Sequence, residues 1–441
     1  MSNFQKLIYG LGGLAIFLSL FSILIVSKST LFPFIVGKYV FFRSMVMLAA
    51  AFYLILVLSG WRFKPDRFSF LKNPLFIAVS IFIAMFFLAG VFGVDFKNSF
   101  WSNFERGEGI FAMLYYFLFM IMCLLFLERD KDWENLFKAS ILAGILMTFY
   151  GFAQKLDAPG VVNIGVGWFG RMQASLGNPS YVSAYLFFAS FYAIYLLIQK
   201  NDLAKKFSWE RVFYGFSLVI FGLGFIFTET KGAFIGLGLA FLAGFIYLIF
   251  NLSKGRLKNY AIAAAVFVVL CAGFLFVFRE NEFIKKLPAS RVLYLSLNER
   301  SAQTRIWTWG SAWNSFLERP LFGWGPENFS LAFDKYFDTR HFEGINIPGE
   351  TWFDRAHSVF FDYLAETGIL GTISFLGIFV LTFWAVFKIK FNNIFQKTFA
   401  MALPIAYLGQ GLLLFDVLPI YINLFLFWGF LIHKSYHKSS N

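Results

Sequence analysis

The chain contains little charge for its length. Asp, Glu, Lys and Arg make up 14% of its 441 residues, while hydrophobic residues make up 59% and aromatic residues 22%. A soluble domain of this size could not bury that much apolar surface. The sequence therefore predicts that the lipid bilayer surrounds most of the protein.

Several motifs that would assign a soluble or cofactor-dependent function are missing. The two cysteines, Cys123 and Cys271, both lie in apolar runs, so neither a disulfide framework nor a metal site is expected. The outer loops carry no His-Glu-x-x-His or Cys-x-x-Cys pattern and no Walker loop, so we expect no cofactor, metal or ATP. The net charge is +13, but no nucleic-acid-binding motif accompanies it, and we expect no nucleic acid partner. The first apolar run has no Ala-x-Ala site after it, so a cleavable signal peptide is not expected.

Long apolar runs are what the chain does contain. A helix needs roughly 20 apolar residues to cross about 30 Å of hydrocarbon. Twelve runs qualify, which predicts an all-α polytopic membrane protein; they are approximately 7–27, 38–59, 75–93, 109–127, 136–154, 181–199, 213–229, 232–250, 260–278, 369–388, 397–414 and 417–432. We divide the chain into helices one to nine (1–278), a large outer loop (279–356), and an interfacial His helix with the last three spans (357–441).

Lysine and arginine set the expected orientation. Basic residues gather in one set of short loops and at both termini, so the positive-inside rule places both termini in the cytoplasm. These loops include Arg62, Arg129, Lys200, Lys254 and Lys388. The loop of residues 279–356 then lies outside, and loops of such length without function are uncommon. An internal repeat is not evident, which disfavours an inverted-repeat transporter.

Two polar groups on the predicted outer side precede apolar runs. Arg171 is followed by Gly177-Asn178-Pro179-Ser180, which is either an ordinary helix entry capped by Asn178 or Ser180, or a re-entrant turn that places Arg171 at the interface. Thr228-Glu229-Thr230-Lys231-Gly232 joins two apolar runs with almost no loop. Lys231 either pairs with Glu229 at the interface or is aimed at an anionic headgroup.

The outer loop contains an amphipathic pattern over residues 302–317. Ile306, Trp309, Trp313 and Phe316 recur every three or four residues and predict one apolar helix face. This face either packs on the membrane surface or helps Arg305, beside it, to reach lipid headgroups. Pro320 and Gly323-Trp324-Gly325 predict that a tight turn follows the helix.

The segment Asp354-Arg355-Ala356-His357-Ser358 closes the loop. The chain has four histidines, and two of them, His433 and His437, lie in its polar C-terminal tail. Asp354 precedes His357 by three residues, so on a helix the carboxylate could hold one imidazole nitrogen and make the other more basic. Glu366 is about 180° from His357 on a straight helix and shares a face with Asp362 instead. Gly368 and Gly371 permit a bend into the next span.

Three cations and one histidine, all predicted on the outer side of the membrane, suit a pyrophosphate ligand. Arg171 and Arg305 could grip phosphate oxygens in a bidentate way, and Lys231 adds a point charge. Such cations would neutralise the charge on a leaving pyrophosphate in place of a metal ion. His357 could then deprotonate an acceptor hydroxyl.

These segments resemble the O-antigen ligase / O-antigen polymerase family of bacterial membrane glycosyltransferases. The resemblance runs from about Arg171 to Lys388. Its matching motifs are Gly177-Asn178-Pro179-Ser180-Tyr181, Thr228-Glu229-Thr230-Lys231-Gly232-Ala233, Arg305 with Trp309 and Pro320-x-x-Gly323-x-Gly325-x-x-Asn328-Phe329, and Asp354-Arg355-Ala356-His357-Ser358 through Glu366-x-Gly368-x-x-Gly371. Lys231 stands where the family usually has Arg, and Ser358 where Asn is common.

The resemblance implies a GT-C-like fold and metal-independent, inverting transfer of a glycan from undecaprenyl pyrophosphate at the outer face of the bacterial inner membrane. The acceptor would be a glycan or a lipid, and membrane lipid surrounds the protein. By motif, Arg305 would bind pyrophosphate and His357 would act on the acceptor, with Arg171, Lys231 and Arg355 as further binding residues. Asp354, Asn178 and Glu366 would support them.

Some alternatives stay open at this level. The family includes ligases, polymerases and protein glycosyltransferases, which share these motifs. A multi-pass carrier or flippase would also explain twelve spans, and it predicts charges at mid-membrane, for which Arg43 and Asp416 are candidates. A purely structural assembly protein would leave the loop motifs unexplained. The aromatic segment from Asp334 to Trp352, which includes His341, is a candidate lid.

Overall fold

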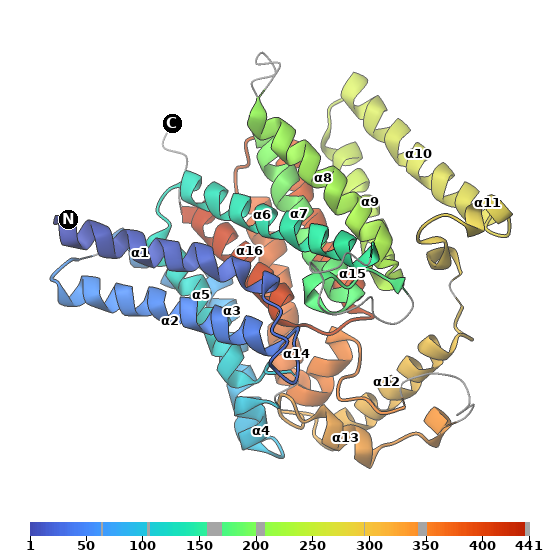
Figure 1. Ribbon diagram of the computed structural model, residues 1–441, viewed down its shortest axis with the longest axis horizontal. Helices are drawn as coiled ribbons and strands as arrows, with labels where there is room; N and C mark the ends of the chain where they lie inside the picture. Colours follow the sequence, from blue (N-terminus) through green and yellow to red (C-terminus); the bar gives the residue numbers. More distant parts are fainter. Residues whose placement is uncertain are drawn as a thin grey trace. The chain divides into compact units, whose positions relative to one another are not determined.

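The fold is helical throughout the described part of the chain. The computed structural model describes residues 1–62, 65–103, 106–156, 170–199, 208–294, 296–342 and 351–436, and these ranges contain no β-strand (Figure 1). The helices are α1 (Asn3–Ser19), α2 (Val36–Leu58), α3 (Pro74–Phe92), α4 (Phe96–Trp101), α5 (Ile110–Phe126), α6 (Asp130–Lys155), α7 (Pro179–Gln199), α8 (Trp209–Thr228), α9 (Lys231–Asn251), α10 (Arg256–Val277), α11 (Glu282–Lys285), α12 (Arg300–Glu318), α13 (Phe329–Lys335), α14 (Val359–Lys388), α15 (Ile394–Gly411) and α16 (Leu418–Tyr436).

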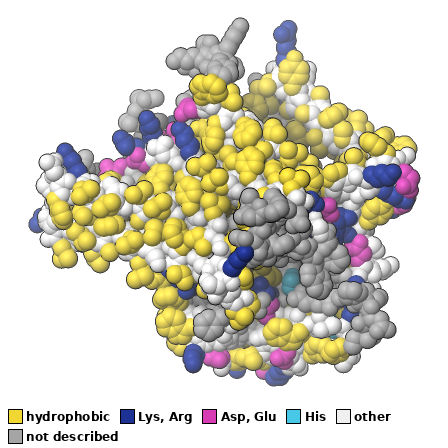
Figure 2. All heavy atoms as spheres, in the orientation of Figure 1, with side chains coloured by type: hydrophobic (Ala, Val, Ile, Leu, Met, Phe, Trp, Pro, Cys, Tyr) yellow, Lys and Arg dark blue, Asp and Glu magenta, His cyan; other side chains and the backbone are white. Residues whose placement is uncertain are grey.

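Each apolar run expected from the sequence coincides with one of these helices. Among the described residues, nine helices are long and apolar enough to cross a membrane, and α5 is a shorter apolar helix. On the face drawn in Figure 2, hydrophobic side chains cover α1 and α2. The prediction of an all-α polytopic membrane protein is confirmed, while the count of twelve spans stays a prediction.

Two compact units make up the chain. Unit 1 contains residues 1–133, 296–389 and 411–441, and unit 2 contains residues 134–295 and 390–410. Within unit 1, α1 packs along α2, α3 along α14, and α5 along α16 (Figure 1). Within unit 2, α7 packs along α8, and α9 approaches α15 so closely that a Cβ on Gly236 would lie 2.5 Å from the carbonyl oxygen of Ala406.

Helix α12 is amphipathic, as predicted, and small or hydroxyl-bearing side chains make up most of its buried face, with Trp309 packed beside them against Phe361. Its buried residues are Thr304, Thr308, Ser311, Ala312 and Ser315. Thr308 Oγ1 donates within the helix, to the Thr304 oxygen at 2.8 Å, whereas Ser311 Oγ donates to the Tyr336 oxygen, also at 2.8 Å. Ile306, Trp313 and Leu317 are 45%, 48% and 58% exposed, which leaves an apolar strip for lipid.

A kink divides α14. Gly368 has φ +61° and ψ −165°, so the predicted bend is confirmed at this residue. The Pro320–Gly325 turn packs against the kink and satisfies backbone groups there. The Ile369 amide donates to the Pro320 oxygen at 2.8 Å, and the Trp324 amide donates to the Ala365 oxygen at 2.9 Å. The two glycine motifs, far apart in the sequence, therefore form one structural junction.

Two histidines lie in protein interior rather than where the sequence placed them. His433 belongs to α16 instead of a polar tail; it is buried, and its Nε2 lies 3.0 Å from Asp130 Oδ1. His341, in the candidate lid, is fully buried against Trp307, Phe333 and Phe353. His437, and residues 343–350 of the candidate lid, lie outside the described residues.

Candidate active site

The predicted site residues are divided between the two units. Arg305, Asp354, Arg355, His357 and Glu366 lie in unit 1, whereas Arg171, Asn178 and Lys231 lie in unit 2.

His357 lies in a turn and not in a helix. Its φ is +53°, a left-handed conformation that side chains other than Gly rarely adopt, and α14 begins two residues later at Val359. The expectation of an interfacial His helix, with Asp354 and His357 neighbours on one face, is therefore wrong at this residue. Non-glycine residues in this conformation are held by their surroundings, and they gather at functional sites.

The peptide before His357 is held on both sides. The Ala356 amide donates to Asp362 Oδ1 at 2.6 Å, and the Ala356 carbonyl accepts from Trp309 Nε1 at 3.0 Å. Asp362 belongs to the first turn of α14, and Trp309 to the middle of α12. Two helices thus fix the backbone from which the imidazole projects. We call residues 353–358 the His357 turn.

Asp354 forms an ion pair with Arg106, a residue that the sequence did not predict to belong to the site. Arg106 donates from Nε to Asp354 Oδ2 at 2.7 Å and from a terminal nitrogen to Oδ1 at 2.9 Å. Such a two-point pair fixes both groups. The guanidinium also lies over the Phe415 ring, 5.0 Å from its centre. The sequence signal was weak, since Arg106-Gly107-Glu108-Gly109 looks like an ordinary span entry.

Arg355 joins two buried carboxylates. One terminal nitrogen lies 3.2 Å from each carboxylate oxygen of Glu366, and the other donates to Glu327 Oε1. Burial alone would lower the pKa of Arg355, but Glu366 and Asp362 raise it above its ordinary value. Glu366 Oε1 also accepts from the Glu327 amide at 3.1 Å. Arg355, Glu327 and Glu366 together therefore connect the His357 turn to α14 and to the loop before α13.

A small polar cavity adjoins this network. It has a volume of about 10 Å³, room for roughly one water. Acidic residues that the sequence analysis did not assign to a site, Glu108 and Asp416, line it together with Asp362 and Glu366. Within the described part of the chain, Glu108 Oε1 and Asp362 Oδ2 are buried without a hydrogen-bond partner. Burial raises the pKa of Glu108 to about 8, so this carboxyl is mostly protonated at neutral pH.

The imidazole of His357 is neutral in this environment. Its burial, and then the positive charges of Arg305 and Arg106, lower the pKa of His357 to about 3, although Asp354 opposes them. Phe353 and Phe415 lie edge-on to the ring, with centres at 5.2 and 5.1 Å. The residue is half-buried, and its Nε2 is shielded from solvent. An anion that neutralised Arg305 and Arg106 would make His357 a stronger base.

In unit 2, cations gather at the C-terminal end of α8. Arg171 donates from Nε to the Thr228 oxygen and from a terminal nitrogen to Thr230 Oγ1, both at 2.9 Å. Lys231 Nζ donates to the Tyr294 oxygen at 2.6 Å. Lys155 is a third cation in this region. The sequence did not predict it as a site residue, because it ends an apolar run. Its Nζ donates to the Gly170 oxygen at 2.5 Å and lies 5.4 Å from the centre of the Phe227 ring.

Asn178 has a structural role that the sequence anticipated. Its Oδ1 accepts from the Ser180 amide at 2.8 Å at the start of α7, which confirms the predicted cap. Gly177 before it has φ +72°. The turn after Arg171 is therefore fixed where the chain enters α7.

One comparison with known proteins gives a match to part of the chain. Residues 216–376 match the model of the O-antigen ligase family. This range includes Lys231, Arg305 and the His357 turn through Glu366, and it begins after Arg171 and Asn178. No curated protein matches the chain. The protein is therefore an integral membrane protein, and its residues 216–376 form a domain similar to the O-antigen ligase family.

Proposed function

We propose that the protein moves a glycan from undecaprenyl pyrophosphate to an acceptor hydroxyl at the outer face of the bacterial inner membrane, with both termini in the cytoplasm. The observation that carries the proposal is the His357 turn, in which a neutral, half-buried imidazole lies beside the charges of Arg305 and Arg106. A base that accepts a proton, next to cations that bind an anionic leaving group, is what glycosyl transfer from a pyrophosphate requires.

His357 acts in this scheme as the general base. It takes the proton of the acceptor hydroxyl while the oxygen attacks the anomeric carbon. The bond from that carbon to the pyrophosphate oxygen breaks, and its electrons leave with the pyrophosphate. One displacement of this kind inverts the anomeric centre.

Arginine and lysine would supply the charge that a metal ion supplies elsewhere. We assign the phosphates to Arg305, and we propose Arg171 and Lys231 as further cations on the basis of their sequence motifs. Lys231 is a point charge without the two-pronged geometry of arginine, so its contribution is to charge rather than to orientation. Arg355 is 7% exposed and paired with Glu327 and Glu366, which favours a part in holding the His357 turn over direct binding of substrate.

The buried charges do not favour the alternative of a carrier or flippase. Arg43 donates to the Gly107 oxygen at 2.7 Å, and Asp416 lines the cavity beside the His357 turn. Arg43 thus contacts the loop that carries Arg106, which pairs with Asp354 of the His357 turn. The acceptor decides between a ligase, a polymerase and a protein glycosyltransferase.

The test is transfer by the purified full chain in detergent, with an undecaprenyl-pyrophosphate glycan as donor and EDTA present. We expect undecaprenyl pyrophosphate to be released together with a lengthened or newly linked glycan, and we expect both products to be lost in His357→Ala and Arg305→Ala. Offering core lipid, free glycan and peptide as acceptors in parallel identifies the class. Transfer that requires added metal, or that survives in both variants, contradicts the proposal.

A further inference from the structure

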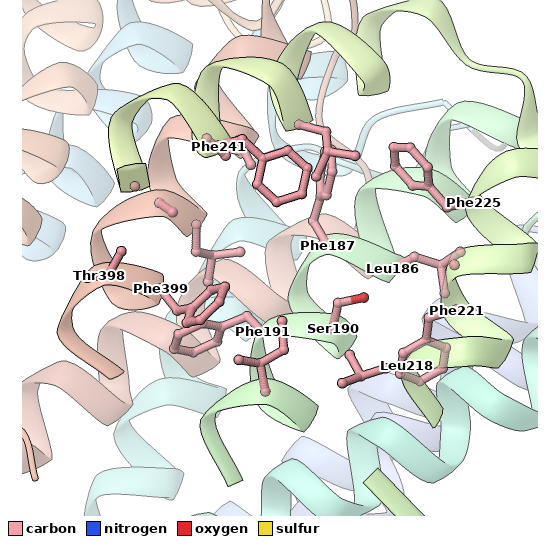
Figure 3. A pocket seen from close by; sticks show the side chains of 18 of the residues that line it. Leu186, Phe187, Ser190, Phe191, Leu218, Phe221, Phe225, Phe241, Thr398 and Phe399 are labelled. Atoms are coloured by element: carbon pink, nitrogen blue, oxygen red, sulfur yellow. The ribbon is translucent and has the colours of Figure 1, made fainter. Parts of the chain in front are cut away.

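Cavities in the two units differ in polarity. Unit 2 has a cavity of about 490 Å³ walled by α7, α8, α9 and α15, and Figure 3 shows phenylalanine side chains gathered around it. Ser190 and Thr398 are hydroxyl-bearing side chains in its lining. The cavity of about 10 Å³ in unit 1 is lined mainly by four carboxyl groups, one arginine and two tyrosines. A ligand of the unit 1 cavity is therefore small and polar.

Two carboxyl oxygens at the unit 1 cavity have no hydrogen-bond partner within the described part of the chain. They are Glu108 Oε1 and Asp362 Oδ2, and the two residues are only 3% and 5% exposed. Buried polar atoms that lack a protein partner are usually satisfied by an ordered water. One water fits the volume, and these two oxygens supply the two partners that such a water requires.

The second oxygen of each carboxyl group is already engaged. Glu108 Oε2 accepts from the Tyr116 hydroxyl at 2.9 Å, and Asp362 Oδ1 accepts from the Ala356 amide at 2.6 Å. Glu108 lies just before α5, and Asp362 belongs to the first turn of α14. A water between the two remaining oxygens would therefore join the start of α5 to the peptide before His357.

The surroundings of Glu108 favour its protonated form. Burial raises the pKa of Glu108 to about 8, so at pH 7 this carboxyl group has a proton to donate. The titratable and charged groups that face it are Tyr116 on α5, Asp362, Tyr363 and Glu366 on α14, Asp416 before α16, Tyr421 on α16, Arg355 of the His357 turn, and Arg43 on α2, which donates to the neighbouring Gly107 oxygen. Arg355 is already paired with Glu366 and Glu327, so its charge is largely balanced.

We propose that Glu108 is a positioning residue whose protonated carboxyl group donates to one buried water, which donates in turn to Asp362. Asp362 holds the amide of Ala356, directly before His357. Glu108 therefore acts on the candidate base without contacting substrate. The kinetic consequence rests on the proposed function, whereas the bridge from Glu108 to Asp362 does not depend on what the protein transfers.

Transfer kinetics of three variants test the hydrogen bonds of Glu108. Glu108→Met keeps the side-chain length but cannot donate, so we expect kcat to fall about tenfold and KM for the donor to change less than about twofold. Glu108→Gln keeps an uncharged donor and should restore kcat to within about threefold of wild type. Glu128→Met, beyond the far end of α5 and 49% exposed, is the control and should match wild type. Equal losses in Glu108→Met and Glu108→Gln, or no loss in either, overturn the proposal.

The pH profile of kcat separates this role from simple packing. Above about pH 8 the wild-type Glu108 ionises, loses the proton that it donates and repels Asp362, so kcat should fall in alkaline solution. The amide of Glu108→Gln does not titrate, so kcat of this variant should stay level over the same pH range. An alkaline fall of the same size in both proteins overturns the proposal.

Hydrogen exchange of the full chain in detergent distinguishes a failure of this inference from a failure of the proposed function. We expect the Ala356 amide to exchange about tenfold faster in Glu108→Met than in wild type, and at nearly the wild-type rate in Glu108→Gln. This pattern with no transfer to any acceptor would refute the proposed function and support the bridge. Unchanged exchange in Glu108→Met overturns the bridge, whatever the rate of transfer.

Discussion

The indole N–H of Trp309 donates to the carbonyl oxygen of Ala356 at 3.0 Å, so a residue in the middle of α12 holds the backbone directly before His357. Arg305 lies one helical turn earlier on the same helix, and its charge acts on His357. Helix α12 thus couples the position of a cation to the position of the candidate base.

Removing this donor should slow the reaction without unfolding the protein. Trp309→Phe keeps an aromatic ring against Phe361, which stacks on Trp309 at 5.1 Å, but leaves the Ala356 oxygen without its partner. We expect kcat to fall about tenfold, the usual order for one buried hydrogen bond, and KM for the donor to change less than about twofold. Trp313→Phe, at a position 48% exposed, is the control and should have no effect. A rise in KM with kcat unchanged would show that Trp309 serves binding instead.

The kink in α14 should tolerate only glycine. A Cβ on Gly368 would lie 2.5 Å from the backbone of Leu321, and its φ of +61° disfavours other residues. Gly368→Ala should destabilise the protein by roughly 2 kcal/mol or more, since the left-handed conformation alone costs about 1–2 kcal/mol. Thermal unfolding in detergent measures this change. Gly377→Ala, on the same helix with open space at its Cβ, should leave the midpoint unchanged or slightly higher. Equal midpoints for the two variants would refute the close approach.

The buried arginine should matter to folding more than any exposed ion pair. Arg355→Met leaves Glu327 and Glu366 buried without their cation, and breaking such a pair costs about 3–5 kcal/mol. We expect a large loss of folded protein on size-exclusion chromatography and a lower thermal midpoint. Lys335→Met breaks a pair with Glu318 in which the lysine is 51% exposed, and it should leave the thermal midpoint nearly unchanged. A stable Arg355→Met variant would contradict the account.

The pH dependence of kcat and of kcat/KM should reveal the environment of His357. An ordinary histidine titrates near pH 6.5, whereas the pKa of His357 is about 3. Its basic form therefore persists in the free enzyme down to about pH 4, and kcat/KM should not fall as the pH drops through 6.5. A bound anion offsets Arg305 and Arg106 and raises this pKa, so the acidic limb of kcat should lie at higher pH than that of kcat/KM. Identical limbs near pH 6.5 in both profiles would show an unperturbed histidine.

The helices were predictable because their signals are local. Apolar runs predicted the helix positions, and the spacing of Ile306, Trp309 and Trp313 predicted α12 within two residues at its start, Arg300. The bend at Gly368 followed from glycine chemistry. In each case the relevant residues are neighbours in the sequence.

The contacts that hold the candidate base were not predictable, because they join distant residues. Arg106 and Asp354 are 248 positions apart, and Glu327 reaches Arg355 only because the Pro320–Gly325 turn packs into the kink of α14. Asp354 looked like the natural partner of His357 on a helix. The backbone instead turns left-handed at His357, since Asp362 and Trp309 fix the preceding peptide, and no periodicity in the sequence encodes that turn.

The most direct test of the central claim separates donor binding from transfer in His357→Gln. In the proposed mechanism His357 accepts a proton from the acceptor hydroxyl, a step typically worth about 10²–10⁴-fold in rate. Single-turnover transfer from a labelled undecaprenyl-pyrophosphate glycan should fall by that order, while equilibrium binding of the same donor should change less than about threefold. Transfer at the wild-type rate, or a matching loss of donor binding, would contradict the assignment of His357 as the base.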